Sequence, residues 1–298
     1  MSFTPADLPD LTGKRVIVTG SNVGIGEVTA RELAARGAEV TLACRNTDAA
    51  REAAGKMTGK TRVEALDLAS LDSVRDFAER WDGPLDLLVN NAGVMTPPSY
   101  RETADGHELM FGTNHLGHFA LTGRLLPALL EADDPRVVTV ASIAHHRGDA
   151  RVLEANPPEG YAAERYYGNS KLANVLFARE LHRRATAADS KLVSTAAHPG
   201  ISATNLVASR EGMGANKLIH LTAPYFMPVL FQSAAKGANP SLYAATKGEP
   251  GSYTGPQWIR ESRGPIGPAK PSRLARDEQL AADLWALSEA KTGIAFAI

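Results

Sequence analysis

Short apolar runs alternate along the chain with longer segments in which apolar residues recur at helical spacing. Six runs rich in β-branched residues predict strands at 15–19, 39–43, 62–66, 85–90, 136–141 and 192–197. Several of these runs are apolar throughout, which is typical of parallel strands covered on both faces. Helix-length segments lie between them, for example at 24–36 and 71–81. The alternation predicts right-handed crossovers and one parallel sheet.

The fold expected from this pattern is α/β, a doubly wound parallel sheet of about seven strands with helices on both faces. The Gly- and Pro-rich stretch at 248–271 resembles a linker, but 252–259 inside it can supply the seventh strand. Residues 273–291 have leucines near helical spacing and predict a closing amphipathic helix. We therefore expect a single domain over 1–298, with halves at about 12–145 and about 146–298.

Composition and charge mainly narrow the expected partners and cellular location of the protein. The 298 residues are 44% hydrophobic and 22% charged, as in ordinary globular proteins. A net charge of −1 gives no reason to expect nucleic acid or an anionic membrane as a partner. Cys44 is the one cysteine, so no intrachain disulfide forms. The chain shows neither a signal peptide nor an apolar run of about 18 residues, so we expect a cytoplasmic protein without a membrane anchor. Homo-oligomerisation stays open.

A glycine-rich turn follows the first predicted strand and opens the first predicted helix. It reads Thr19-Gly20-Ser21-Asn22-Val23-Gly24-Ile25-Gly26. Such a turn lets a pyrophosphate lie against backbone N–H groups at the positive end of the helix. We expect Gly20 to permit the turn, Gly24 to permit close approach and Gly26 to permit close packing. The first half of the chain is thus predicted to bind a dinucleotide.

Three more strand ends should face the same ligand. Arg45 and Asn46 follow the second strand, at the position where NAD-binding folds carry an acidic residue. A guanidinium suits a 2′-phosphate, so the sequence favours NADP (as NADPH). Arg45 taken alone is also compatible with a solvated loop charge. Asp67 and Leu68 end the third strand, where a carboxylate can accept from the adenine amino group. The fourth strand ends in small residues that let backbone approach the ribose, Asn90-Asn91-Ala92-Gly93.

Tyr167 and Lys171 lie four residues apart near the start of a helical stretch that continues to about residue 184, so they share a face. A phenol with a pKa of about 10 is a poor base near neutrality, and a nearby ammonium should lower that pKa. We therefore predict that Tyr167 exchanges a proton with the substrate and that Lys171 also binds the nicotinamide ribose. Tyr166 has Ser170 at the equivalent spacing and is the weaker candidate.

Ser142 and Asn114 complete the candidate chemistry. Ser142 closes the fifth strand, where a hydroxyl can polarise a carbonyl, although strand-end serines are often only turn residues. Asn114 lies in a helical segment, where asparagine is unfavourable. It either binds backbone and a water that relays protons to Lys171, or marks a local kink.

Together these motifs resemble the classical short-chain dehydrogenase/reductase family, which has a Rossmann-type fold, and the resemblance covers nearly the whole chain. It implies a catalytic tetrad of Asn114, Ser142, Tyr167 and Lys171 and hydride transfer between NADP(H) and a carbonyl or alcohol. The segment after the sixth strand, with Pro199, Gly200 and Thr204, resembles the family's contact with the carboxamide of the nicotinamide. The sequence is most similar to retinol-dehydrogenase-like and protochlorophyllide-reductase-like members, through 43–46, 113–119 and 170–174.

Three features depart from compact or membrane-bound members of that family. Ser142 and Tyr167 are 25 positions apart, which leaves an insertion at 147–166. We expect no N-terminal anchor, unlike many animal retinol enzymes, and Ala141 replaces the first serine of a frequent pair. The tetrad itself is unaffected.

Alternative functions, metal binding and the substrate pocket can also be considered from the sequence. A catalytically idle NADP-binding sensor or scaffold is the alternative from another class, and an extended-family nucleotide-sugar epimerase would need another glycine spacing. No metal is expected, because the histidine pairs at 115/118 and 145/146 come without a ligand cluster. The pocket should be formed by Val94-Met95, the insertion and an apolar segment after Thr204, so a lipophilic substrate is favoured. The apolar residues of that segment are Leu206, Met213, Leu218, Leu221, Phe226 and Phe231.

Overall fold

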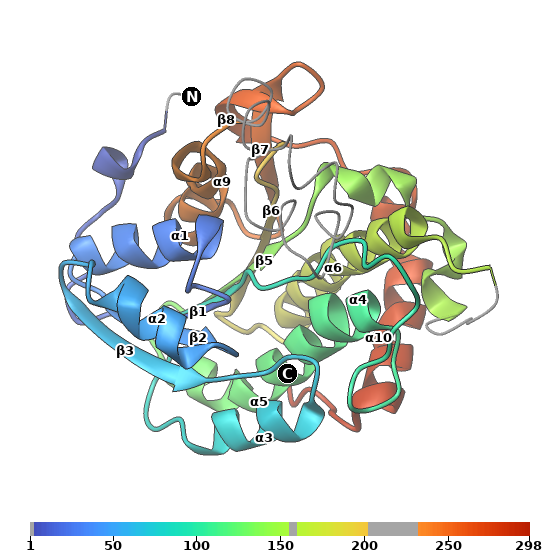
Figure 1. The fold of residues 1–298 in the computed structure, drawn as a ribbon, viewed down its shortest axis with the longest axis horizontal. Helices are drawn as coiled ribbons and strands as arrows, with labels where there is room; N and C mark the ends of the chain where they lie inside the picture. The colour runs from blue at the N-terminus through green and yellow to red at the C-terminus, as the bar shows by residue number, and fades with distance from the viewer. Residues whose placement is uncertain (1–2, 155–159, 202–231) are drawn as a thin grey trace.

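The computed structural model describes residues 3–154, 160–201 and 232–298, and its centre is one sheet of eight strands (Figure 1). The strand order is β3-β2-β1-β4-β5-β6-β7-β8. The first seven strands are parallel, and β8 is antiparallel to β7. In chain order the strands are β1 Arg15–Thr19, β2 Glu39–Cys44, β3 Lys60–Ala65, β4 Leu87–Asn90, β5 Arg136–Val140, β6 Val193–Ala197, β7 Tyr253–Trp258 and β8 Arg263–Pro268. The predicted doubly wound parallel sheet is confirmed.

Helices cover both faces of the sheet because alternate strand residues point to opposite sides. Val16 and Val18 of β1 belong to a core shared with α1 and α9, whereas Ile17 belongs to a core shared with α3, α5, α6 and α10. The helices are α1 Gly24–Ala35, α2 Thr47–Ala54, α3 Leu71–Glu79, α4 Leu109–Phe111, α5 Gly117–Glu131, α6 Ala163–Ala187, α9 Ala234–Thr246 and α10 Glu278–Thr292. Short 3₁₀ turns are η1 Pro5–Asp7, η3 Ile143–Arg147, η4 Ala150–Glu154 and η6 Leu274–Arg276, and a π-helical turn, η2 Gly112–Leu116, joins α4 to α5.

The predicted closing helix is divided into two pieces. The turn η6 comes first, and α10 begins after Asp277, whose carboxylate accepts from the Leu280 N–H at 3.0 Å. Trp285 of α10 is buried against Phe119 and Phe177, so α10 lies against α5 and α6 (Figure 1). None of the helices in the described ranges is both long and apolar enough to cross a membrane.

Candidate active site

The loop between β1 and α1 is shaped by glycines. Gly20 and Gly24 have φ values of 62° and 66°, a region that L side chains avoid. A Cβ on Gly20 would lie 2.9 Å from the Cα of Ala92, and one on Gly26 would lie 2.5 Å from the Gly20 carbonyl oxygen. Val23, the residue before α1, offers no side-chain cap. The loop therefore leaves backbone N–H groups at the start of α1 for an anion, as the glycine pattern predicts.

Side chains in and beside this loop are largely committed to the protein. The Ser21 hydroxyl is buried and donates to the Val18 carbonyl at 2.8 Å, so Ser21 presents only backbone to a ligand. Asn91 donates from its amide to the Thr19 carbonyl at 2.8 Å, and its backbone N–H donates to the Thr19 hydroxyl at 2.9 Å. The ends of β1 and β4 are thereby held together at the carboxyl edge of the sheet. Asn22 and Ile25 are half-buried in the same loop.

The ends of β2 and β3 lie at the same edge. Arg45 is exposed directly after β2, whereas the Asn46 side chain accepts from the Ala49 N–H at 3.0 Å and caps α2. Asp67 is half-buried and accepts from the Ala69 N–H at 2.9 Å. Leu68 is buried in the core, so only its backbone can face a ligand.

Lys171 is buried on α6, beneath the segment that follows β4. Its Nζ donates to the Val140 carbonyl at 3.1 Å, and the Asn174 amide donates to the same oxygen at 3.1 Å. A Cβ on Gly93 would lie 3.5 Å from the Lys171 Nζ, so the glycine brings backbone close to the ammonium. Burial lowers the pKa of Lys171 to about 8.

Tyr167 departs from the expectation drawn from its spacing to Lys171. Burial raises the pKa of the Tyr167 phenol, and a hydrogen bond with the Ser142 side chain opposes that rise only in part. The Lys171 Nζ lies 5.9 Å from the centre of the Tyr167 ring and donates elsewhere. The predicted lowering of the pKa by Lys171 is therefore wrong for this structure, because desolvation outweighs an ammonium at that distance.

Ser142 lies two residues after the end of β5, and its side chain bonds to Tyr167. Its hydroxyl also accepts from the Ala144 N–H at 3.1 Å, which caps η3. His145 is buried behind it: Nδ1 donates to the Ser142 carbonyl at 2.7 Å, and Nε2 accepts from the Ser272 N–H at 3.1 Å. His145 thus supports the backbone of Ser142, whereas His146 is exposed.

Asn114 lies in the π-helical turn η2, and its side chain binds backbone as expected; the water relay to Lys171 stays a prediction. Its Oδ1 accepts from the Val94 N–H at 2.8 Å, and its Nδ2 donates to the Val94 carbonyl at 3.0 Å. Nδ2 also lies 2.9 Å from the Ser170 hydroxyl on α6. The side chain therefore fixes the segment after β4 against α6. The sequence reasoning missed Thr19 and His118, whose buried side chains bond to each other at 2.9 Å beside this cluster.

The segment after β6 begins at the same edge. Gly200 donates its N–H to His198 Nδ1 at 3.2 Å, and the Pro199 carbonyl accepts from the Gln232 amide at 2.6 Å. Thr204 and the apolar residues of the segment after it, which were predicted to line the pocket, lie outside the described residues. No group of three or more possible metal ligands occurs among the residues that are described.

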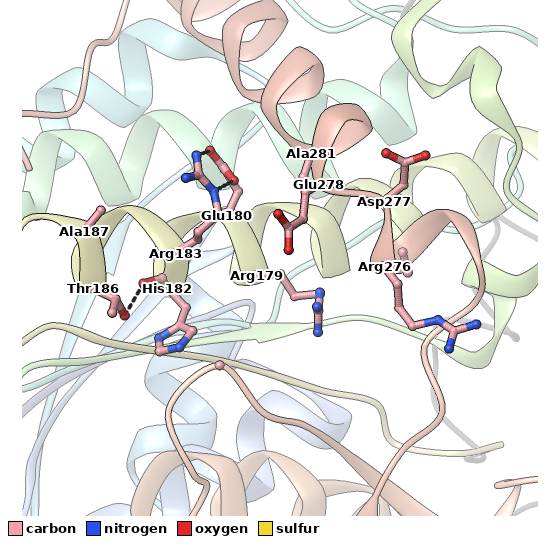
Figure 2. Close-up of a pocket in the computed structure, with 12 residues that line it drawn as sticks. Arg179, Glu180, His182, Arg183, Thr186, Ala187, Arg276, Asp277, Glu278 and Ala281 are labelled. Atoms are coloured by element: carbon pink, nitrogen blue, oxygen red, sulfur yellow. Dashed lines mark hydrogen bonds and ion pairs between the residues drawn. The ribbon is translucent and has the colours of Figure 1, made fainter.

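A groove of about 380 Å³ lies elsewhere, between the second half of α6 and the start of α10 (Figure 2). Arg179, His182 and Arg183 line it from α6, and Arg276 and Glu278 line it from the facing segment. Arg179 is twelve residues beyond Tyr167, or about 18 Å along the helix. This groove is therefore separate from the cluster around Tyr167.

Comparisons with known proteins agree with the fold. A family described as short chain dehydrogenase matches residues 14–213. Retinol dehydrogenase 13 of Mus musculus is 39% identical in an alignment 298 positions long, gaps included, that covers 96% of this chain and 86% of that protein. Retinol dehydrogenase 12 of Mus musculus is 42% identical over 243 residues, which cover 79% of this chain and 74% of that protein.

Two solved structures extend the comparison. An uncharacterised protein from Mycobacterium paratuberculosis superposes with a TM-score of 0.85 at 43% identity, covering 100% of both chains. A short chain dehydrogenase from Shigella flexneri, solved with NADP, has a TM-score of 0.64 at 22% identity over 83% of this chain and 98% of that chain, and shows likeness of fold alone. The chain belongs to the short-chain dehydrogenase family of oxidoreductases, and its relatives include retinol dehydrogenases.

Proposed function

We propose that this protein transfers a hydride between NADP(H) and a carbonyl or alcohol, with Tyr167 as the proton-transfer group. The observation that carries the proposal is the meeting of Tyr167, Ser142 and Lys171 at the carboxyl edge of the sheet, beside the loop that follows β1. Ligands of doubly wound sheets bind at this edge, where the strand order reverses. Here the reversal lies between β1 and β4.

The residues present fit a dinucleotide. A Cβ at Gly20 or Gly26 would fill the space that the loop leaves, and the start of α1 has no side-chain cap. Gly20, Gly24 and Gly26 would admit the pyrophosphate, Asp67 and Asn91 would face the adenosine half, and Lys171 would hold the nicotinamide ribose. When bound, the cofactor supplies or accepts the hydride.

The protonation state of Tyr167 at neutral pH suits the proton donor that reduction of a carbonyl requires. Because burial raises the pKa of Tyr167, its phenol keeps its proton and can donate it to a carbonyl oxygen that gains a hydride. The Ser142 hydroxyl, which bonds to the same phenol, would hold that oxygen in line. Asn114 fixes Val94 and Ser170 and so holds the backbone on which the substrate pocket is built.

Arg45 supports NADP over NAD. It is exposed directly after β2, where its guanidinium can meet a 2′-phosphate. The Shigella flexneri protein of the same fold was solved with NADP. The relatives named as retinol dehydrogenases, together with the apolar segment after Thr204, support a lipophilic alcohol or aldehyde as substrate. We further propose that residues 1–298 form one domain and that the protein is cytoplasmic.

The test is reduction of a panel of lipophilic aldehydes and ketones, followed by the absorbance of NADPH. Tyr167→Phe should reduce turnover by a factor of a hundred or more, since proton transfer by a positioned group contributes roughly that much. Tyr166→Phe is the matched control, because Tyr166 is the neighbouring phenol and its ring packs against Tyr161, 5.0 Å away. Equal losses in the two variants would contradict the assignment. Absence of turnover in the wild type with NADPH bound would favour an idle sensor.

A further inference from the structure

A buried histidine spans the gap between the cofactor loop and the Asn114 cluster. His118 lies in the first turn of α5 and is 1% exposed. Its Nδ1 is 2.9 Å from the Asn114 carbonyl oxygen, and its Nε2 is 2.9 Å from the Thr19 hydroxyl. Both ring nitrogens are therefore engaged, each by a residue of the candidate site.

The partners determine which nitrogen carries the proton. A carbonyl oxygen only accepts, so Nδ1 must be the donor to Asn114. Nε2 is then an acceptor, provided that the ring is neutral. The Thr19 hydroxyl already accepts from the N–H groups of Asn91 and Ala92, both at 2.9 Å, so its own hydrogen is available to donate. The Val89 carbonyl competes for that hydrogen at the longer distance of 3.3 Å. The bonds thus run from Thr19 to His118 to Asn114.

The ring is neutral over the working pH range. Burial lowers the pKa of His118 to about 4; the Asn114 carbonyl opposes this, and the charge of Lys171 adds to the lowering. A second charge beside the buried ammonium is thereby avoided. His118 keeps one tautomer and one orientation at neutral pH.

Each end of this chain of bonds belongs to a different part of the site. Thr19 immediately precedes Gly20 and holds the segment that follows β4. Asn114 clamps Val94 and reaches Ser170. Ser170 is the residue before Lys171 and donates to the Tyr167 carbonyl at 2.9 Å. His118 therefore bonds through Nε2 to the residue that precedes Gly20, and through Nδ1 to the turn whose Asn114 side chain bonds to α6.

We propose that His118 is a positioning residue that holds the cofactor loop through Nε2 and, through Nδ1, the turn that contacts the helix carrying Tyr167 and Lys171; this rests on the proposed function. The neighbouring histidine serves as a contrast. His115 is equally buried, but its Nε2 bonds to Ser288 of α10, 2.8 Å away and outside the site. His115 therefore contacts no described residue of the candidate site through its ring nitrogen Nε2, and we assign it a structural role.

Two substitutions at His118 separate the two bonds. Asparagine places its amide near the position of Nδ1 and keeps the donor to Asn114, whereas glutamine reaches the position of Nε2 and keeps an acceptor for Thr19. We expect His118→Asn to raise the Kd for NADPH about fivefold, with a nearly normal single-turnover rate at saturating NADPH. His118→Gln should give the reverse, a normal Kd and a rate about fivefold lower. His115→Asn, the matched control, should change thermal stability alone.

The proposal is overturned if both His118 variants keep the wild-type Kd and rate, or if they lose both in equal measure. Should the variants not fold, ¹⁵N resonances of the wild-type imidazole decide. We expect a proton on Nδ1 and a shift of the His118 resonances when NADPH is added; a proton on Nε2, or unshifted resonances at saturating NADPH, overturns the proposal. Failure of the proposed function is distinguishable, because it appears in the wild type as no NADPH binding or no turnover.

Discussion

Replacing Lys171 with methionine removes a buried charge and keeps much of the apolar stem. The residue is 4% exposed, and its ammonium donates to the Val140 carbonyl. The lowering of its pKa from 10.5 to about 8 corresponds to about 3 kcal/mol against the charged form in the folded state. Lys171→Met should therefore increase the free energy of unfolding at pH 7 by about 1–3 kcal/mol, because some of the gain is lost with the hydrogen bond.

The gain should depend on pH in a defined direction. Below pH 8 the lysine is charged in both folded and unfolded chains, so the wild type bears the full cost of burial. Between about pH 8 and 10.5 the folded protein loses the proton first, and the wild type becomes more stable as the pH rises. The advantage of Lys171→Met should consequently shrink over that interval and vanish above it. Urea denaturation at pH 7 and pH 10.5 measures both values.

Activity should move in the opposite direction. Without the ammonium the cofactor ribose loses a donor, so the Kd for NADPH should rise and turnover should fall well below the wild type. Lys191→Met is the matched control: Lys191 is exposed, so removing its charge should leave the free energy of unfolding at pH 7 and the Kd for NADPH little changed. A Lys171→Met protein that is less stable than the wild type at pH 7, or equally stabilised at both pH values, would refute the reasoning.

Two further predictions concern residues proposed to bind the cofactor. Arg45→Asp should raise the Kd for NADPH at least about tenfold and leave the Kd for NADH little changed, because a charge-assisted hydrogen bond to the 2′-phosphate is lost and a repulsion is gained. Fluorescence titration measures both Kd values, and equal affinities of the wild type for the two cofactors would contradict the NADP preference. Gly26→Ala should lower the free energy of unfolding by about 1–3 kcal/mol and weaken NADPH binding, because the new Cβ meets the Asn91 amide and the Gly20 carbonyl. Gly55→Ala, where a Cβ meets only ordinary contacts, is its control, and similar losses in both would count against the packing argument.

Most of the sheet was predictable because β1, β2, β4, β5 and β6 are buried along nearly their whole length and therefore consist largely of apolar residues. β1 lies where its apolar run predicts, and β2 to β7 begin and end within two residues of the predictions. The eighth strand was missed because it contains Gly264, Pro265, Gly267 and Pro268, which indicate turns. It lies at the edge of the sheet, where proline's missing N–H is tolerated. Local composition therefore fails for β8 and not for β3, the other edge strand, because only β8 is rich in glycine and proline.

The placement of the candidate residues on the fold was predictable, whereas their energetics were not. Spacing alone brings Tyr167 and Lys171 to one face of a helix, and α6 does begin before them, at Ala163. The effect of Lys171 on Tyr167 depends on distance and burial, which a four-residue spacing does not define. Desolvation of both groups then reverses the expected direction for the phenol.

The bonds that organise the site run largely to main-chain atoms. Lys171 and Asn174 bind the Val140 carbonyl, Asn114 binds both polar groups of Val94, and His118 binds the Asn114 carbonyl. Every residue has such groups, so no side-chain pattern marks which of them are used. The one available signal was asparagine inside a helical segment, where it is unfavourable. In the structure that residue lies in a π-helical turn, a conformation found often at functional sites. A residue that opposes its local structure thus pointed to the centre of the network, although its partner His118, which suits a buried helix, gave no such sign.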